Sequence, residues 1–106
     1  MKTVESSLLD EMVRRLVARF HPEKVILFGS QVWGQADEDS DLDLMVIVSG
    51  SDAPPAERAR QAYRCLRGIN VPTDVLVRTR KEIDRFSSVH ASLESEILER
   101  GRVLYG

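Results

Sequence analysis

The sequence predicts a layered fold of the α/β or α+β class in a single domain, residues 1–106. Two observations predict this class. Short apolar runs, typical of buried strands, alternate with longer stretches of helical periodicity. The link between the first two apolar runs is too short for a full crossover helix, so these two strands are expected to be antiparallel neighbours. An apolar content of 42% and a charged content of 30% are those of a soluble globular protein, which fits such a domain.

The first half of the chain provides one helix and two strands. Residues 3–20 are predicted to form an amphipathic helix, because apolar side chains recur there at three- and four-residue spacing. The helix ends before Pro22, since a proline cannot continue the hydrogen-bond ladder. Residues 25–28 and 44–48 are continuous apolar runs, so we expect strands over residues 24–28 and 42–48 whose two faces are both covered. A loop over residues 29–40 joins them.

A second helix and a third strand follow. The helix is predicted from the proline pair at positions 54 and 55, which suits a first helical turn, to about residue 67. Gly68 is a natural stop for it. The third strand is predicted over residues 71–77, where Asp74 interrupts an otherwise apolar run. The apolar side of the helix is formed by Ala59, Ala62, Tyr63 and Leu66.

The C-terminal part adds two short helices and an edge strand. Thr79 and Glu82 form a capping box, Thr-Arg-Lys-Glu, which predicts the start of a short helix. Apolar side chains at helical spacing over residues 89–97 define a last helix, which Gly101 closes. Residues 102–105 are predicted to form a short strand at an edge of the sheet.

The chemistry is concentrated in the stretch GSQVWGQADEDSDLD, residues 29–43, which lies between the first two strands. A glycine-rich loop can hold phosphates through its backbone N–H groups. Side chains alternate along a strand, so Asp41 and Asp43 are expected on the same side. Two adjacent carboxylates repel each other unless a cation lies between them, and Mg²⁺ prefers a few carboxylates together with substrate phosphates.

A third carboxylate is available at Asp74. An ionised side chain is costly to bury in an apolar strand without a partner, so we expect Asp74 to join the metal site. Three carboxylates could hold two ions ~3.5–4 Å apart, which is the arrangement of two-metal catalysis. If the first two strands are antiparallel neighbours, Gly29 and Ser30 lie beside Asp41 and Asp43.

Two other cation or phosphate motifs do not fit. In a P-loop beginning at the first glycine, Gln35 and Ala36 would occupy the positions of the required Lys and Ser/Thr. In an EF-hand loop beginning at Asp37, Leu42 and Val48 would occupy the positions of the required glycine and bidentate glutamate. Both motifs are therefore excluded.

Charge and composition exclude further classes. The formal charge of −2 gives no long-range attraction to nucleic acid or to an anionic membrane. The single cysteine, Cys65, excludes an internal disulfide and fits a reducing compartment. Acidic residues near the N-terminus replace the apolar segment of a signal peptide, and no apolar run approaches the ~20 residues of a membrane span. We expect a cytoplasmic protein with neither a membrane nor a direct nucleic-acid partner.

The stretch GSQVWGQADEDSDLDLMV resembles the signature of the DNA polymerase β-type nucleotidyltransferases: Gly-Ser, a glycine a few residues later, then Ser-Asp-x-Asp-Leu. The segment TDVLV is similar to the third-aspartate strand of that family, and ILERGRVLY is similar to the tail of its small members. The similarity covers nearly the whole chain. Its length resembles the minimal nucleotidyltransferases (MNT) of prokaryotes.

The resemblance implies a mixed β-sheet with helices packed on it. It also implies magnesium-dependent transfer of a nucleoside monophosphate, AMP from ATP, to an acceptor hydroxyl with release of pyrophosphate. Gly29 and Ser30 would bind the triphosphate, and Asp41 and Asp43 would bind Mg²⁺. Asp74 would complete the metal site and act as the general base.

The chain departs from the family at two positions. Many members carry a basic residue at one or both of the positions that Gln31 and Trp33 occupy here. The departure concerns phosphate affinity, and whether it weakens activity is left open. A Trp usually buries much of its area, so we expect Trp33 to pack under the loop rather than stack on a base.

Small nucleotidyltransferases of this kind are often antitoxins that pair with a HEPN-type toxin, typically a ribonuclease, and can silence it by attaching AMP. The resemblance therefore implies a HEPN toxin as partner and acceptor. The alternatives are a stand-alone transferase that acts on a small molecule and a non-catalytic antitoxin that neutralises its partner by binding. The presence of Asp41, Asp43 and Asp74 favours the enzyme. The acceptor, the choice of triphosphate and the oligomeric state are left open.

Overall fold

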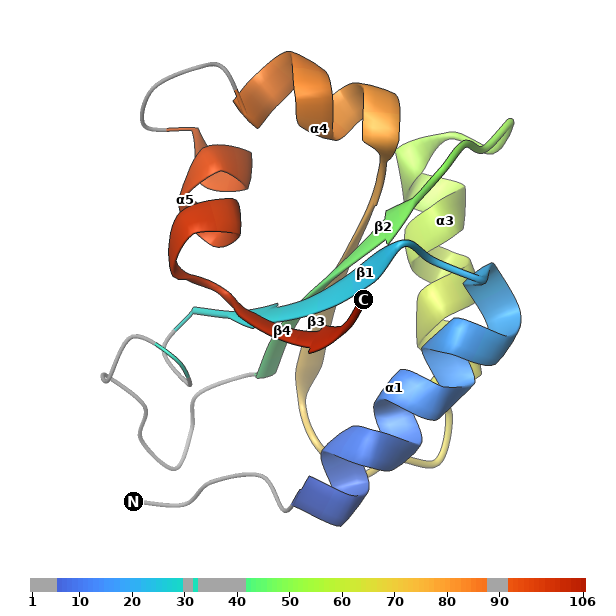
Figure 1. Cartoon of the computed structure of the whole chain (residues 1–106). Coiled ribbons are helices and arrows are strands. Elements are labelled where there is room, and N and C mark those ends of the chain that lie inside the picture. Colours follow the sequence, from blue (N-terminus) through green and yellow to red (C-terminus); the bar gives the residue numbers. More distant parts are fainter. Residues whose placement is uncertain (1–5, 30–31, 33–41, 88–91) are drawn as a thin grey trace.

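A computed structural model describes residues 6–29, 32, 42–87 and 92–106. Figure 1 shows a central sheet with α1 and α3 on one face and α4 and α5 on the other. The predicted α/β layer arrangement is therefore confirmed. The elements in chain order are α1 (Ser6–Phe20), β1 (Lys24–Phe28), β2 (Leu42–Val48), α3 (Pro55–Cys65), β3 (Thr73–Thr79), α4 (Arg80–Ser87), α5 (Leu93–Arg100) and β4 (Arg102–Tyr105).

The sheet has four strands in the order β3-β2-β1-β4 and is mixed. Strand β1 pairs antiparallel with both β2 and β4, as expected from the short link between the first two strands. Strands β2 and β3 are parallel, and α3 is the crossover between them. The first residues of β2 and β3 therefore meet at one end of the sheet, beside the last residue of β1.

The core consists of two layers, one on each face of the sheet. Alternate residues of the strands pack under α1 and α3, where Met12, Leu16 and Ala62 are fully buried. The other set of alternate residues packs under α4 and α5, where Ile83 and Ile97 are fully buried. Because both faces are covered, β1 and β2 read as continuous apolar runs in the sequence.

A buried ion pair connects α3, β3 and α4. Arg58 on α3 is only 4% exposed, and its guanidinium donates to both carboxylate oxygens of Glu82 at 2.8 and 3.0 Å. It also donates to the carbonyl oxygens of Ala53 and Val77, so its donors are well used. The hydrogen bonds from Arg58 lower the pKa of Glu82 to about 2. The ion pair fixes α4 against the end of β3.

The same glutamate caps α4. The amide of Thr79 donates to Glu82 Oε1 at 2.8 Å, and the amide of Glu82 donates to Thr79 Oγ1 at 3.1 Å. This is the reciprocal pattern of a capping box, so the predicted start of this helix is confirmed. Thr79 ends β3 and caps α4, which explains why no linker separates the two elements.

Two predicted boundaries were wrong by a few residues. Strand β3 covers Thr73–Thr79 instead of 71–77, because it pairs residue for residue with β2 up to Val48. Helix α3 ends at Cys65 instead of residue 67, and the chain turns through Gly68, whose φ of +89° favours glycine. Helix α5 begins at Leu93, where Ser92 caps it by accepting from the amide of Ser95 at 3.0 Å.

Some predictions lie outside the described residues, among them the first turn predicted for α1 and the segment before Ser92. None of the helices in the described ranges is long and apolar enough to cross a membrane. The predicted edge strand at residues 102–105 is confirmed as β4.

Candidate functional site

The candidate site is a row of side chains across three strands. Phe28 of β1 pairs with Asp43 of β2, and Asp43 pairs with Asp74 of β3. Paired residues of neighbouring strands project from the same face, so the three side chains lie side by side. This is the face covered by α4 and α5, because Met45 and Leu76, two residues further along, pack in that layer. Strands lie about 4.8 Å apart, so the two aspartates are immediate neighbours.

The backbone of Gly29 lies directly against the side chain of Asp43. Its φ is +81°, in the left-handed region that side chains other than glycine rarely adopt. A Cβ atom at this position would lie 2.2 Å from Asp43 Oδ2 and 3.1 Å from Asp43 Cγ. The carboxylate thus rests directly against the glycine backbone. This position therefore requires glycine for two reasons: its positive φ, and the lack of room for a Cβ atom beside the Asp43 carboxylate.

Backbone hydrogen bonds hold both ends of the link between β1 and β2. The amide of Val32 donates to the carbonyl oxygen of Gly29 at 3.0 Å, which closes a tight turn after β1. The amide of Leu42 donates to the carbonyl oxygen of Pro72 at 2.9 Å, which ties the start of β2 to the chain just before β3. The second bond sets the register that places Asp43 beside Asp74.

The surroundings of Asp74 differ from the expectation. We expected the cost of burial to require a partner for this carboxylate, but Asp74 is exposed. It projects from β3, an outermost strand, so water reaches it and no burial penalty arises. Asp43, on the next strand inward, is half-buried. The pair therefore has one sheltered carboxylate and one that is open to solvent.

Tyr63 was not predicted as part of this region. It lies on α3, and its hydroxyl oxygen accepts a hydrogen bond from the backbone amide of Val75 at 3.3 Å. The peptide bond that carries this amide is the one that follows Asp74. In the sequence Tyr63 belongs to the apolar side of its helix, and nothing in the pattern distinguishes it from a core residue. Its hydroxyl therefore pairs with one backbone N–H group on the outer edge of β3.

The structure thus brings Gly29, Asp43 and Asp74 together, as predicted from the sequence. The other residues of the predicted site, Ser30 and Asp41, lie outside the described residues, and so do Gln31 and Trp33, where the chain departs from the family. Among the described residues, no group of three His, Cys, Asp or Glu side chains gathers as a metal site. The remaining carboxylate of the predicted cluster, Asp41, is one of those not described.

The donor set fits a hard divalent cation. Asp43 and Asp74 supply carboxylate oxygens, the ligands that Mg²⁺ prefers. A cation between two neighbouring carboxylates also removes their mutual repulsion. The bare backbone of Gly29 lets the Asp43 carboxylate lie where the side chain of another residue would be. These features suit a metal-bound phosphate group and do not require a deep cavity.

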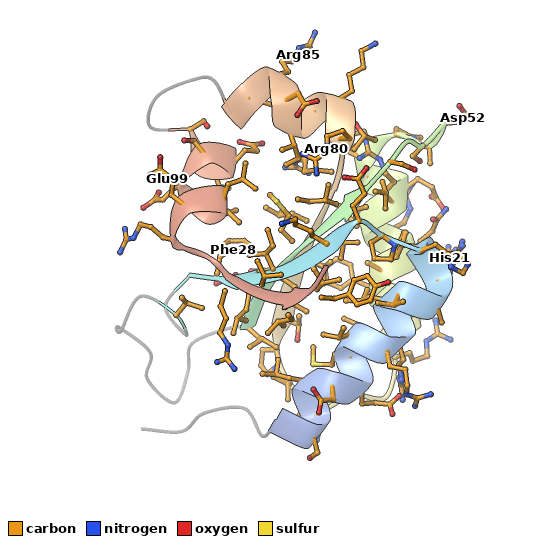
Figure 2. All side chains as sticks on the ribbon, viewed as in Figure 1. His21, Phe28, Asp52, Arg80, Arg85 and Glu99 are labelled. Atoms are coloured by element: carbon orange, nitrogen blue, oxygen red, sulfur yellow. The ribbon has the colours of Figure 1, made fainter. Side chains whose placement is uncertain are left out.

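A cavity of about 620 Å³ lies at the far end of the sheet. Its lining includes Arg58, Thr79 and Arg85, from the end of β3 and from α3 and α4. Figure 2 shows Arg85 well away from Phe28, which marks the row of candidate residues. Because Asp43 and Asp74 begin their strands and Thr79 ends β3, this cavity is no part of the candidate site.

Comparison with known proteins agrees with this geometry. Residues 11–106 match the model of the family described as polymerase beta, nucleotidyltransferase, so the chain belongs to this family of nucleotidyltransferases. Among solved structures, the chain is similar to a protein from Sulfolobus solfataricus considered to be a nucleotidyltransferase, with 28% identity and a TM-score of 0.61. The match covers 74% of this chain and 70% of that protein. A search of the curated proteins found no match.

Proposed function

We propose that this chain is a magnesium-dependent nucleotidyltransferase that moves AMP from ATP to a hydroxyl group of a HEPN-type toxin and so acts as an antitoxin. The observation that carries the proposal is the pair Asp43 and Asp74 on adjacent strands, with Gly29 packed against the first carboxylate. Membership of the nucleotidyltransferase family supports the reaction class.

Each residue has a distinct role in this proposal. Asp41, Asp43 and Asp74 would hold Mg²⁺, in a two-ion site. When bound, Mg²⁺ would neutralise charge on the triphosphate and on the departing pyrophosphate. The absence of a side chain at Gly29 leaves room for the Asp43 carboxylate, and Gly29 and Ser30 would bind the phosphates of the triphosphate.

In the proposed reaction, the acceptor oxygen forms a bond to the α-phosphorus of ATP. The bond between that phosphorus and the oxygen bridging to the β-phosphorus breaks, and pyrophosphate leaves with the bonding pair. Asp74 accepts the proton of the acceptor hydroxyl as general base. Its exposed position on β3 lets an acceptor approach, while the half-buried Asp43 remains beside the nucleotide.

The open position of Asp74 is also what supports a protein acceptor. It lies on an outermost strand of the sheet, at the end away from the cavity bounded by α3 and α4. A hydroxyl group on the surface of a folded partner can approach such a position without entering a pocket. The identity of that partner as a HEPN toxin rests on the resemblance to minimal nucleotidyltransferases.

Mass spectrometry of the co-expressed partner tests the proposal. The product of a neighbouring HEPN-encoding reading frame is expressed with the wild-type chain, with Asp43→Asn or with Asp52→Asn. Asp52 is the matched control, since it is an exposed aspartate after the other end of β2, and Figure 2 shows it far from Phe28. We expect the partner to gain one AMP with the wild type and with Asp52→Asn, but not with Asp43→Asn.

The other outcomes separate the alternatives. Neutralisation of an unmodified partner by all three chains would mean that the chain works by binding. Nucleotidyl transfer to a small-molecule hydroxyl, with an unmodified partner, would mean a stand-alone transferase. Either result would contradict the proposed acceptor.

A further inference from the structure

The outer edge of β4 is open within the described part of the chain. Strand β4 is the last in the order β3-β2-β1-β4, and no described strand pairs with its far side. An open edge presents backbone N–H and C=O groups that another strand can bind. Strand β4 is short and its pairing with β1 contains a bulge, but its sequence RVLY has no proline that would prevent pairing on the far side.

The apolar side chains of this edge are also uncovered. Val103 is 49% exposed and Tyr105 is 40% exposed. Beside Tyr105 lies a groove of about 400 Å³ against α1, with half-buried Val13 and Val17 in its wall. The full lining is Asp10, Val13, Arg14, Val17, Ala18 and Tyr105. A strand added to β4 would lay its side chains along this groove.

We propose that a second copy of this chain occupies the edge, with the two β4 strands antiparallel about a two-fold axis through Val103. Leu104 is the extra residue of the bulge in the pairing of β4 with β1, so it does not count in this register. Two four-stranded sheets then form one continuous sheet. In this register Arg102 of each copy is opposite Tyr105 of the other. The proposal concerns assembly and is independent of the reaction proposed above.

The orientation of the side chains makes this register self-complementary. Tyr105 pairs with Val25 and Arg102 pairs with Leu27, and both partners belong to the core layer under α1. Arg102 and Tyr105 therefore project from the face that carries α1. Across the two-fold axis, each Arg102 reaches the other copy's Tyr105 and the groove beside it.

Charge complementarity favours a second copy of this chain as the partner that binds the edge of β4. The groove beside Tyr105 includes Asp10, and neither Asp10 nor Arg102 has an ion-pair partner among the described residues. The dimer brings Arg102 of one copy to Asp10 of the other, and the symmetry forms this pair twice. The guanidinium would also lie near the ring of Tyr105, a favourable contact between a cation and an aromatic face.

On the opposite face of β4, which carries α4 and α5, the exposed side chain of Val103 also finds a contact in this dimer. Val103 pairs with Ile26, which belongs to the layer under α4 and α5, so its exposed side chain projects to that side. In the antiparallel register the two Val103 side chains lie directly opposite each other on the axis, close enough for contact. Both faces of the joined strands thus gain a favourable contact.

Sedimentation velocity over a range of concentrations tests the dimer. The wild-type chain should sediment as a species of twice its mass of 12.0 kDa. Arg102→Glu places a like charge beside the other copy's Asp10, and Asp10→Lys places one beside Arg102. Each variant should weaken dimerisation by about tenfold or more, because like charges across an interface cost over one kcal/mol.

The charge-swapped double variant, Arg102→Glu with Asp10→Lys, decides the register. It should restore dimerisation to near the wild-type level, since the pair is re-formed with opposite polarity. Arg67→Glu, the same charge change at an exposed residue after α3, is the control and should dimerise normally. A monomeric wild type would overturn the proposal. So would a dimer that ignores both single variants, or single variants whose effects the swap does not reverse.

Discussion

Replacement of Gly29 by alanine tests the geometry of the candidate site with one added methyl group. The substitution should have two separate effects, one on the backbone of Gly29 and one on the side chain of Asp43. The φ of +81° imposes a backbone cost of about 1–2 kcal/mol on any side chain other than glycine. The new Cβ would lie 2.2 Å from Asp43 Oδ2, a distance that two such atoms cannot keep. Since the carboxylate is the end of a side chain, it can rotate away, and the fold should survive.

Two other glycines provide matched controls. Gly68 has a similar φ of +89°, but no atom lies within 4 Å of a Cβ placed there. Gly68→Ala should therefore carry the backbone cost without disturbing any carboxylate. Gly50 has neither a positive φ nor a neighbour within 4 Å, so Gly50→Ala should change little.

Urea unfolding and calorimetry with Mg²⁺ and a non-hydrolysable ATP analogue distinguish these variants. We expect Gly29→Ala and Gly68→Ala to lose similar stability, about 1–2 kcal/mol. Only Gly29→Ala should lose metal-dependent nucleotide binding, because only there is Asp43 displaced. Native binding by Gly29→Ala would refute the reasoning that Gly29 and Asp43 share one site.

Two further predictions concern the residues that hold the sheet to its helices. Tyr63→Phe removes the hydroxyl that accepts from the Val75 amide, and urea unfolding should show a loss of about 0.5–1.5 kcal/mol. The second concerns Glu82, whose pKa falls from 4.5 to about 2 through its bonds with Arg58. Because the pKa is lowered, its stabilisation is complete above pH about 4.5 and disappears as the pH falls toward 2; the shift corresponds to ~3 kcal/mol. Stability measured against pH should show this loss in the wild type and not in Glu82→Gln, and equal acid sensitivity of the two would contradict it.

Most of the sheet could be predicted from the sequence because its strands are buried on both faces. Uninterrupted apolar runs gave the bounds of β1 and β2, and the short link between them indicated antiparallel pairing. The bounds of β3 were harder to predict from the sequence. Its last residues, Arg78 and Thr79, are polar, and they belong to the strand because they pair with β2. That pairing is a tertiary constraint, and local periodicity does not contain it.

The candidate site was predictable to the extent that it follows from strand order. Asp43 and Gly29 lie together because β1 and β2 are antiparallel neighbours, which the short link indicated. The position of Asp74 follows from the parallel pairing of β3 with β2, whereas the family resemblance implied only a mixed sheet. Burial was inferred wrongly for Asp74, since an apolar sequence around a residue does not reveal that its strand is outermost. The contact of Tyr63 with Val75 depends on how α3 lies over β3, and no residue pattern encodes it.

Calorimetric titration of the wild-type chain and of Asp43→Asn with a non-hydrolysable ATP analogue, each with and without Mg²⁺, tests the central claim most directly. Asparagine keeps the shape of the side chain and removes its charge, so the fold beside Gly29 should persist. The account predicts that the wild type binds the nucleotide only with Mg²⁺, that Asp52→Asn behaves like the wild type, and that Asp43→Asn does not bind. Nucleotide binding that is independent of Mg²⁺, or that Asp43→Asn retains, would contradict the assignment of this site.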